Sequence, residues 1–192
     1  MKQKIVLLLE DDNLQAETIA KAVNGHLRGV TVEILATESD AYARFEEMAK
    51  AGTTPMLVIS DVMMPWAEAG PVVPPPPPAV VKGTFRKAGT RSWGNFRGRN
   101  EFAKVPWIYF TVLDEDTIEY KKYTDEFTGF RQKDGPVGPL LEEIDAYLKM
   151  DDAWTESETK LSERLAASTT TKKSLIDGLR TPLTECIQYS HP

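Results

Sequence analysis

The chain has 192 residues, of which 41% are hydrophobic, and this suits one ordinary domain with an appendage rather than two full domains. Its formal net charge of −6 gives no overall electrostatic case for direct nucleic-acid binding. Cys186 is the only cysteine, which excludes an intramolecular disulfide framework and a metal site built from several cysteines. No segment reaches transmembrane length, so we expect no membrane contact and a cytoplasmic location.

Strands and helices alternate in the first part of the chain. Apolar or β-branched runs predict strands at 4–9, 30–35 and 57–61, with the second nearer the sheet edge. Helical periodicity predicts helices at 13–24 and 39–50, ended by Gly25 and Gly52, with Leu14 on the buried face of the first. This order with short loops is typical of a doubly wound parallel sheet.

A proline-rich segment at 66–88 then interrupts the alternation. It carries Pro71 and the run from Pro74 to Pro78, a composition that disfavours helix interiors and favours polyproline II. Three interpretations stay open: a tolerated surface insertion, a docking segment for an aromatic-lined groove, and a flap over Asp61, from which the segment departs.

The alternation resumes after the proline-rich segment. We expect a helix at 88–100 anchored by Trp93 and Phe96, a strand at 106–111, a polar helix at 114–123, a strand at 127–132 and a closing helix at 140–150. The closing helix should bury Leu141, Ile144 and Leu148. The prediction is therefore an α/β domain over 1–149 with a doubly wound, five-stranded parallel sheet, followed at 150–192 by a helical tail or linker too short for a winged-helix domain.

Chemically active side chains stand at the ends of the predicted strands. Glu10 and Asp11 follow the first strand, Asp61 and Thr111 end the third and fourth, and Lys133 follows the fifth. The carboxyl ends of parallel strands meet at one edge of a sheet, so these groups should converge. Clustered carboxylates need a cation, and hard oxygen ligands favour Mg²⁺. Acids, an ammonium and a hydroxyl together suit transfer of a phosphoryl group onto a carboxylate.

The motifs around these residues closely resemble the receiver domain of two-component response regulators, which has the CheY-like, flavodoxin-like fold. They are the stretch from Ile5 to Asp12, the stretch from Ile59 to Pro65, the stretch from Phe110 to Asp114, and Lys133. The resemblance covers about residues 1–149, and the four pieces occur in the family's order.

The resemblance implies a role for each of these residues. Asp61 is similar to the phosphoacceptor, and Glu10 and Asp11 to the acid pair that binds Mg²⁺ together with Asp61 and the backbone carbonyl of Met63. Thr111 resembles the switch hydroxyl, and Lys133 would bridge phosphoryl oxygens. Phe130 occupies the position of the aromatic that turns inward on activation.

Three features depart from the family pattern. The segment between Pro65 and Gly89 is on the order of twenty residues longer than usual, well beyond ordinary loop lengths. Val112 replaces the small residue that usually follows the switch threonine, which would narrow access to Asp61. Asp134 replaces a common proline and puts the cis peptide bond after Lys133 in doubt.

The resemblance implies a receiver that takes a phosphoryl group from a histidine kinase or phosphotransfer protein and signals through contact with a downstream protein. Such a protein is a regulatory phosphoacceptor rather than an enzyme, apart from its own Mg²⁺-dependent phosphorylation and dephosphorylation, and it could also form a homodimer. The alternative is a phosphorylation-independent interaction module that docks through 66–88. A phosphatase-like hydrolase is disfavoured because Met63 stands where a second acid would be needed.

Overall fold

The computed structural model describes residues 4–67, 74–83 and 85–149. The chain divides into two units, Met1–Tyr147 and Leu148–Pro192. The helices predicted for the tail at 150–192 lie outside the described residues. No helix within the described ranges is both long enough and apolar enough to cross a bilayer.

A parallel sheet of five strands forms the centre of the first unit, in the order β2-β1-β3-β4-β5. The strands are β1 (Lys4–Leu9), β2 (Val30–Leu35), β3 (Leu57–Ser60), β4 (Trp107–Thr111) and β5 (Thr128–Gln132). All five follow the predicted runs, and β2 lies at an edge as expected. Every residue of β3 and β4 is buried, which explains why these strands read as continuous apolar runs rather than as alternating ones.

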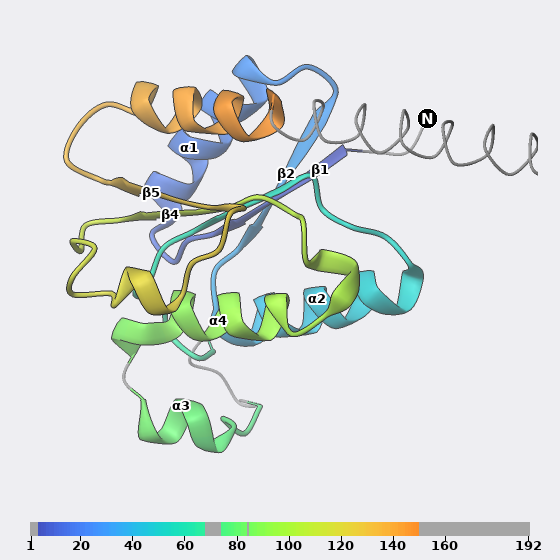
Figure 1. Ribbon diagram of the computed structural model, residues 1–192, viewed down its shortest axis with the longest axis vertical. Coiled ribbons are helices and arrows are strands. Elements are labelled where there is room, and N and C mark those ends of the chain that lie inside the picture. The colour runs from blue at the N-terminus through green and yellow to red at the C-terminus, as the bar shows by residue number, and fades with distance from the viewer. Residues whose placement is uncertain (1–3, 68–73, 84, 150–192) are drawn as a thin grey trace, which may run out of the picture. The chain divides into compact units, whose positions relative to one another are not determined.

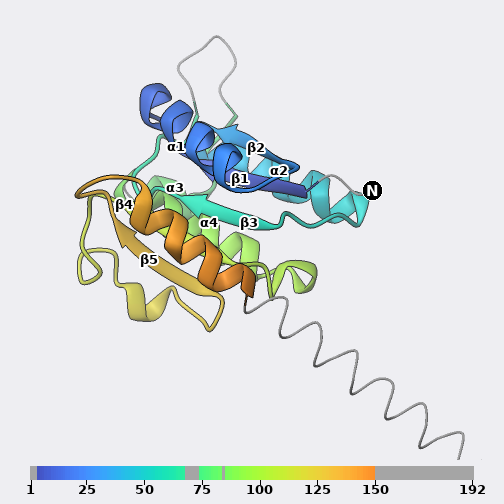
Figure 2. The same ribbon diagram turned by 90° about the horizontal axis from the view of Figure 1, so that it is seen from above.

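Helices cover both faces of the sheet (Figures 1 and 2). α1 (Asn13–His26) and a helix at 138–149 lie on one face, and α2 (Glu38–Ala51) and α4 (Ala88–Arg97) lie on the other. The predicted α/β fold class, a doubly wound parallel sheet, is confirmed. The closing helix begins at 138 and buries Leu140 and Ile144, whereas Leu141 and Leu148, predicted to be buried, are only half-buried.

Two glycines were predicted to end the first two helices, and the structure confirms one of them. Asp12 caps α1 by accepting a hydrogen bond from the Gln15 N–H, but the helix passes through Gly25 to His26, so the predicted stop is wrong. The chain first takes a left-handed conformation later, at Gly29, where φ is 71°. α2 does end at Gly52, with φ of 62°, as predicted. Leu14 is 75% exposed rather than buried.

The proline-rich segment contains two short elements that its composition did not predict. They are α3 (Pro78–Lys82) and a 3-10 turn, η1 (Phe85–Lys87). Pro78 starts α3, where its missing N–H costs no hydrogen bond. α3 has no buried residue and lies beyond α4 on the side away from the sheet (Figure 1).

The connection between β4 and β5 differs most from the prediction. In place of the helix expected at 114–123, the chain forms turns and one 3-10 element, η3 (Tyr120–Lys122). Glu119 has a φ of 55°, which is incompatible with a continuous helix. α4 is also shorter than expected, because it ends at Gly98 and is followed by a second 3-10 turn, η2 (Asn100–Phe102).

Aromatic rings form a connected series from the core toward β5. Phe96 contacts Trp107 with ring centroids 5.4 Å apart, and Trp107 contacts Tyr109 at 6.0 Å. Tyr109 contacts Tyr120 at 6.2 Å, and Tyr120 contacts Phe130 at 5.8 Å. The Tyr120 hydroxyl also donates to the Thr128 carbonyl, 2.6 Å away, so this series fastens the non-helical connection to the sheet.

Candidate functional site

The backbone brings the predicted site residues to one edge of the sheet. Main-chain pairing continues one residue past the strands, since the Asp61 N–H donates to the Leu9 carbonyl at 2.8 Å. The N–H of Lys133 donates to the Thr111 carbonyl at 2.8 Å. Parallel pairing therefore places the residues at the carboxyl ends of β1, β3, β4 and β5 at one edge of the sheet, as the sequence predicted.

The ammonium of Lys133 joins two of these acids. Its Nζ lies 2.7 Å from Asp61 Oδ2 and 2.5 Å from Glu10 Oε2. The Lys133 side chain is only 7% exposed and that of Glu10 only 2%, so the three charges interact with little solvent screening. The second oxygen of Asp61 accepts hydrogen bonds from the N–H groups of Val62 and Met63, which fixes the carboxylate.

The negative charge of the clustered carboxylates exceeds the single positive charge that Lys133 supplies. One carboxylate oxygen from each of Glu10, Asp11 and Asp61 lies within 4.8 Å of the others. Burial raises the pKa of Glu10 even though Lys133 opposes this, and burial also raises the pKa of Asp11. Burial alone would lower the pKa of Lys133, but the negative charges of Asp61 and Glu10 outweigh it and raise that pKa. A divalent cation held by hard oxygen ligands would relieve the repulsion, so the donor set fits Mg²⁺.

A pocket of about 560 Å³ opens over these acids. Its charged part consists of Glu10, Asp11, Asp12, Asp61 and Lys133. Its apolar part consists of Met63, Met64, Pro65, Phe85 and Val112. The pocket therefore combines charged groups suited to a phosphoryl group with large apolar side chains.

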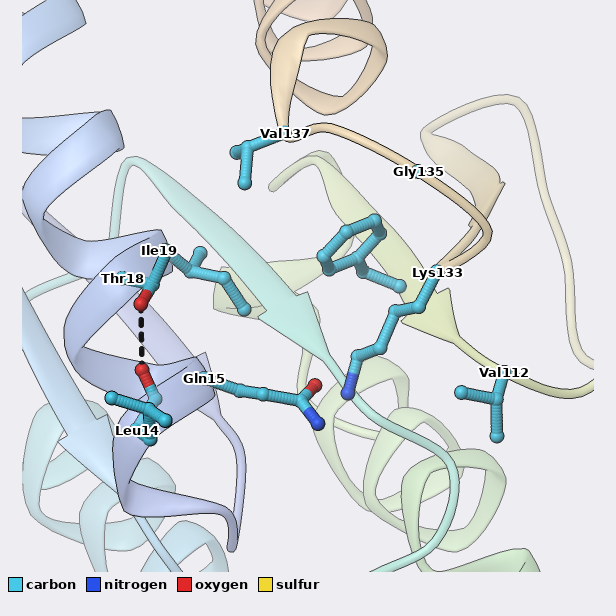
Figure 3. Close-up of a pocket in the computed structure, with 9 residues that line it drawn as sticks. Leu14, Gln15, Thr18, Ile19, Val112, Lys133, Gly135 and Val137 are labelled. Carbon is cyan, nitrogen blue, oxygen red and sulfur yellow. Dashed lines mark hydrogen bonds between the residues drawn. The ribbon is translucent and has the colours of Figure 1, made fainter.

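A second pocket of about 360 Å³ lies between α1 and the loop after β5 (Figure 3). Gln15, Val112 and Lys133 line both pockets, so the two adjoin. In Figure 3 the side chains of Gln15 and Lys133 extend toward one another, and Leu14 stands at the margin. Leu14 is therefore exposed at the margin of a concave surface that adjoins the acidic pocket.

Solved structures are similar to this arrangement of elements. The signal receiver domain of a histidine kinase from Syntrophus aciditrophicus is 21% identical with a TM-score of 0.55, over 76% of this chain and 90% of that chain. The signal receiver domain of a putative Luxo repressor protein from Vibrio parahaemolyticus is 18% identical with a TM-score of 0.57, over 82% and 98%. The chemotaxis protein CheY4 from Vibrio cholerae is 19% identical with a TM-score of 0.54, over 76% and 99%.

The chain has the receiver fold. No protein-family model matches the sequence, and no curated protein matches it. The structural likeness confirms the fold expected from the motifs, and a fold by itself does not determine a function.

Two residues expected to report the state of a receiver do not line the acidic pocket. Thr111 is buried, and its hydroxyl accepts a hydrogen bond from the Leu113 N–H at 3.4 Å. Among the described residues, no hydrogen bond joins that hydroxyl to Asp61. Phe130 is half-buried, with its ring against Tyr120. Their switching roles stay predictions. All described peptide bonds are trans, including the one after Lys133.

The structure adds two residues to the site of the receiver fold that the sequence did not single out. Gly89 donates its N–H to the Val62 carbonyl at 3.0 Å, and a Cβ at this position would lie 2.2 Å from the Asp61 carbonyl oxygen. In the sequence, Gly89 only weakens the prediction of a helix at 88–100. A glycine at the start of a helix can also indicate that another segment of backbone approaches closely there, and this signal could have found it. Phe85 lines the acidic pocket, and no sequence signal places it there, because its position depends on the path of 66–88.

Proposed function

We propose that this protein is a phosphoacceptor receiver that takes a phosphoryl group on Asp61 from a histidine kinase or phosphotransfer protein. The observation that carries the proposal is the placement of the Lys133 ammonium within hydrogen-bonding distance of both Asp61 and Glu10. Such a cation, beside a carboxylate whose second oxygen is held by backbone N–H groups, is placed to stabilise the negative charge of a phosphoryl group that arrives at Asp61.

In the proposed reaction an Asp61 carboxylate oxygen attacks the phosphorus atom of the donor. The bond from phosphorus to the donor atom breaks, and its electron pair leaves with the donor, so an acyl phosphate forms on Asp61. Lys133 would pair with the phosphoryl oxygens as they arrive. Glu10, Asp11, Asp61 and the Met63 carbonyl would hold Mg²⁺, which supplies positive charge that offsets the charge of the phosphate.

The proposed output is a change of surface conformation rather than turnover of a substrate. Thr111 would move toward the phosphoryl group, and Phe130 would turn inward from its half-buried position against Tyr120. A downstream protein would read the altered surface near β5. Cytoplasmic location and homodimer formation stay predictions.

Phosphorylation of the purified protein tests this proposal. The protein is incubated with Mg²⁺ and acetyl phosphate, and intact mass is followed over time. We expect one phosphoryl group on the wild type and on Asp116→Asn, a control at an exposed acid outside the pocket. Asp61→Asn should take up none. Absence of phosphate on the wild type, or equal uptake by Asp61→Asn, would contradict the proposal.

A second candidate function is a phosphorylation-independent interaction module. The exposure of Pro74, Pro75 and Pro76 favours it, because an extended proline run can dock into an aromatic-lined groove. Changing Pro75 and Pro76 to serine leaves the hydrogen bond between the Trp66 indole and the Pro74 carbonyl intact. Capture of a partner protein is then compared for both proteins, with and without acetyl phosphate. If the serine substitutions abolish capture and acetyl phosphate does not alter it, the interaction module is supported over the phosphoacceptor.

A further inference from the structure

Phe85 contacts the phosphoacceptor pocket from within the proline-rich segment. Among the described residues of 66–88 it alone lines the pocket that contains Asp61. Phe85 is 59% exposed, and it does not belong to the hydrophobic core formed by the described residues. Leaving so much aromatic surface in water forgoes burial energy, on the order of 25 cal/mol for each Å². Its position therefore has no explanation in core packing.

The backbone of Phe85 is fixed to the Asp61 loop. The Phe85 carbonyl accepts a hydrogen bond from the Met64 N–H at 3.2 Å. Four residues later, the Gly89 N–H donates to the Val62 carbonyl, where only glycine fits against the Asp61 backbone. Phe85 is thus itself one of two attachments to the residues that immediately follow the phosphoacceptor, and the second follows four residues later.

The start of the same segment is also attached to the domain. The Trp66 carbonyl accepts from the Ser39 N–H at 2.8 Å, and the Trp66 ring meets Tyr42 edge-on at 5.7 Å. Further along, Gly83 passes so close to Arg91 that a Cβ would lie 2.6 Å from a guanidinium nitrogen. These contacts dock the described parts of the segment on α2 and α4 and give Phe85 a defined place.

Phe85 belongs to an apolar collar around the charged groups of the pocket. The other large members are Met63 and Val112, whereas Met64 also lines the pocket but is buried in the core. Apolar side chains at the mouth of a charged site limit the approach of water and of the reacting partner while leaving the charged groups themselves unchanged. The collar therefore limits access to Asp61, and Phe85 is the described residue of 66–88 that belongs to it.

We propose that Phe85 is a specificity-determining residue that restricts which phosphodonors reach Asp61 and how fast water removes the phosphoryl group. This inference rests on the proposed phosphoacceptor function. In the hydrolysis step, a water oxygen attacks phosphorus and the bond between phosphorus and the Asp61 oxygen breaks. Its electron pair returns to the carboxylate, and the proton of the water passes to the released phosphate or to solvent.

The experiment compares variants that shrink and enlarge the Phe85 side chain. Wild type, Phe85→Ala, Phe85→Trp and Val81→Ala are phosphorylated with acetyl phosphate and Mg²⁺, then freed of donor, and gain and loss of phosphate are followed by intact mass. Val81 is the matched control, since it is 70% exposed on the same segment and does not line the pocket. Urea unfolding of all four proteins verifies the fold.

Phe85→Ala should gain and lose phosphate on the order of tenfold faster, which corresponds to ~1.4 kcal/mol in each barrier. Phe85→Trp should be slower than wild type in both steps, and Val81→Ala should match wild type. Equal rates in all four proteins, or slowing by both Phe85 substitutions, would overturn the inference and leave the phosphoacceptor function standing. A wild type that takes up no phosphate would overturn the proposed function, and this inference with it.

Discussion

Replacing Gly89 by alanine should damage both the stability and the chemistry of the site. The added Cβ would lie 2.2 Å from the Asp61 carbonyl oxygen and 2.8 Å from the Val62 Cα, whereas real Cβ contacts are essentially never shorter than 3.0 Å. The obstructing atoms are backbone, so α4 or the Asp61 loop has to move by about 0.8 Å, the difference between 3.0 and 2.2 Å. Overpacking of this kind costs about 1–3 kcal/mol of the free energy of unfolding.

The displacement also moves Asp61 relative to Lys133. A misplacement of about 1 Å in a reacting group can reduce a rate by about a hundredfold, so we expect phosphorylation by acetyl phosphate to slow by about ten- to a hundredfold. Urea unfolding measures the first effect, and intact mass against time measures the second. The control is Gly94→Ala in the same helix, where nothing lies within 4 Å of the new Cβ. This control should be neutral or more stable by up to about 1 kcal/mol. If Gly89→Ala matched Gly94→Ala in both measurements, the claim of close approach would be refuted.

Three further predictions concern charge. Burial raises the pKa of Glu10, so this carboxylate gains a proton at a higher pH than an exposed glutamate does. Mg²⁺ affinity measured by calorimetry should therefore weaken as the pH falls, and less so in Glu10→Gln. An equal pH dependence in both proteins would contradict this. Lys133→Met leaves Glu10 and Asp61 without their cation and should cost about 3 kcal/mol of unfolding free energy in EDTA. Mg²⁺ should restore part of this stability, because it would bind the same acids in the folded protein. No effect of Mg²⁺ on the variant would contradict this prediction. Arg91→Met removes the only cation paired with the fully buried Glu38 carboxylate among the described residues, although the Tyr42 hydroxyl still donates to it, and should cost about 3–5 kcal/mol of unfolding free energy. Adding Glu38→Gln should recover part of this loss. A double variant no more stable than the single one would show that the uncompensated charge is not the cause.

The sequence was sufficient to predict the sheet because its inner strands are buried on both faces. An apolar run such as 57–61 has few other stable environments in a domain of this size, and β-branched residues at 30–35 suit an edge strand. The placement of Glu10, Asp61 and Lys133 then follows from parallel pairing alone. Their convergence was therefore predictable from the parallel pairing of the strands, without any knowledge of side-chain contacts.

Features that depend on tertiary contacts could not be predicted in this way. Gly25 lies in open space and stays helical, while the turn is made at Gly29, so composition alone does not tell which glycine ends α1. The predicted helix at 114–123 gives way to turns held by Tyr120, whose ring and hydroxyl bind to β4 and β5. The place of Phe85 depends on where 66–88 returns to the domain.

The connected aromatic rings give the protein a built-in optical probe. Trp93 donates its indole N–H to the Thr128 hydroxyl at the start of β5 and meets Tyr123 edge-on, while Trp107 is linked through Tyr109 and Tyr120 to Phe130. Rotation of the Phe130 ring would change the surroundings of these indoles. Their emission spectrum would thus record rearrangement near β5 in real time, with no attached dye.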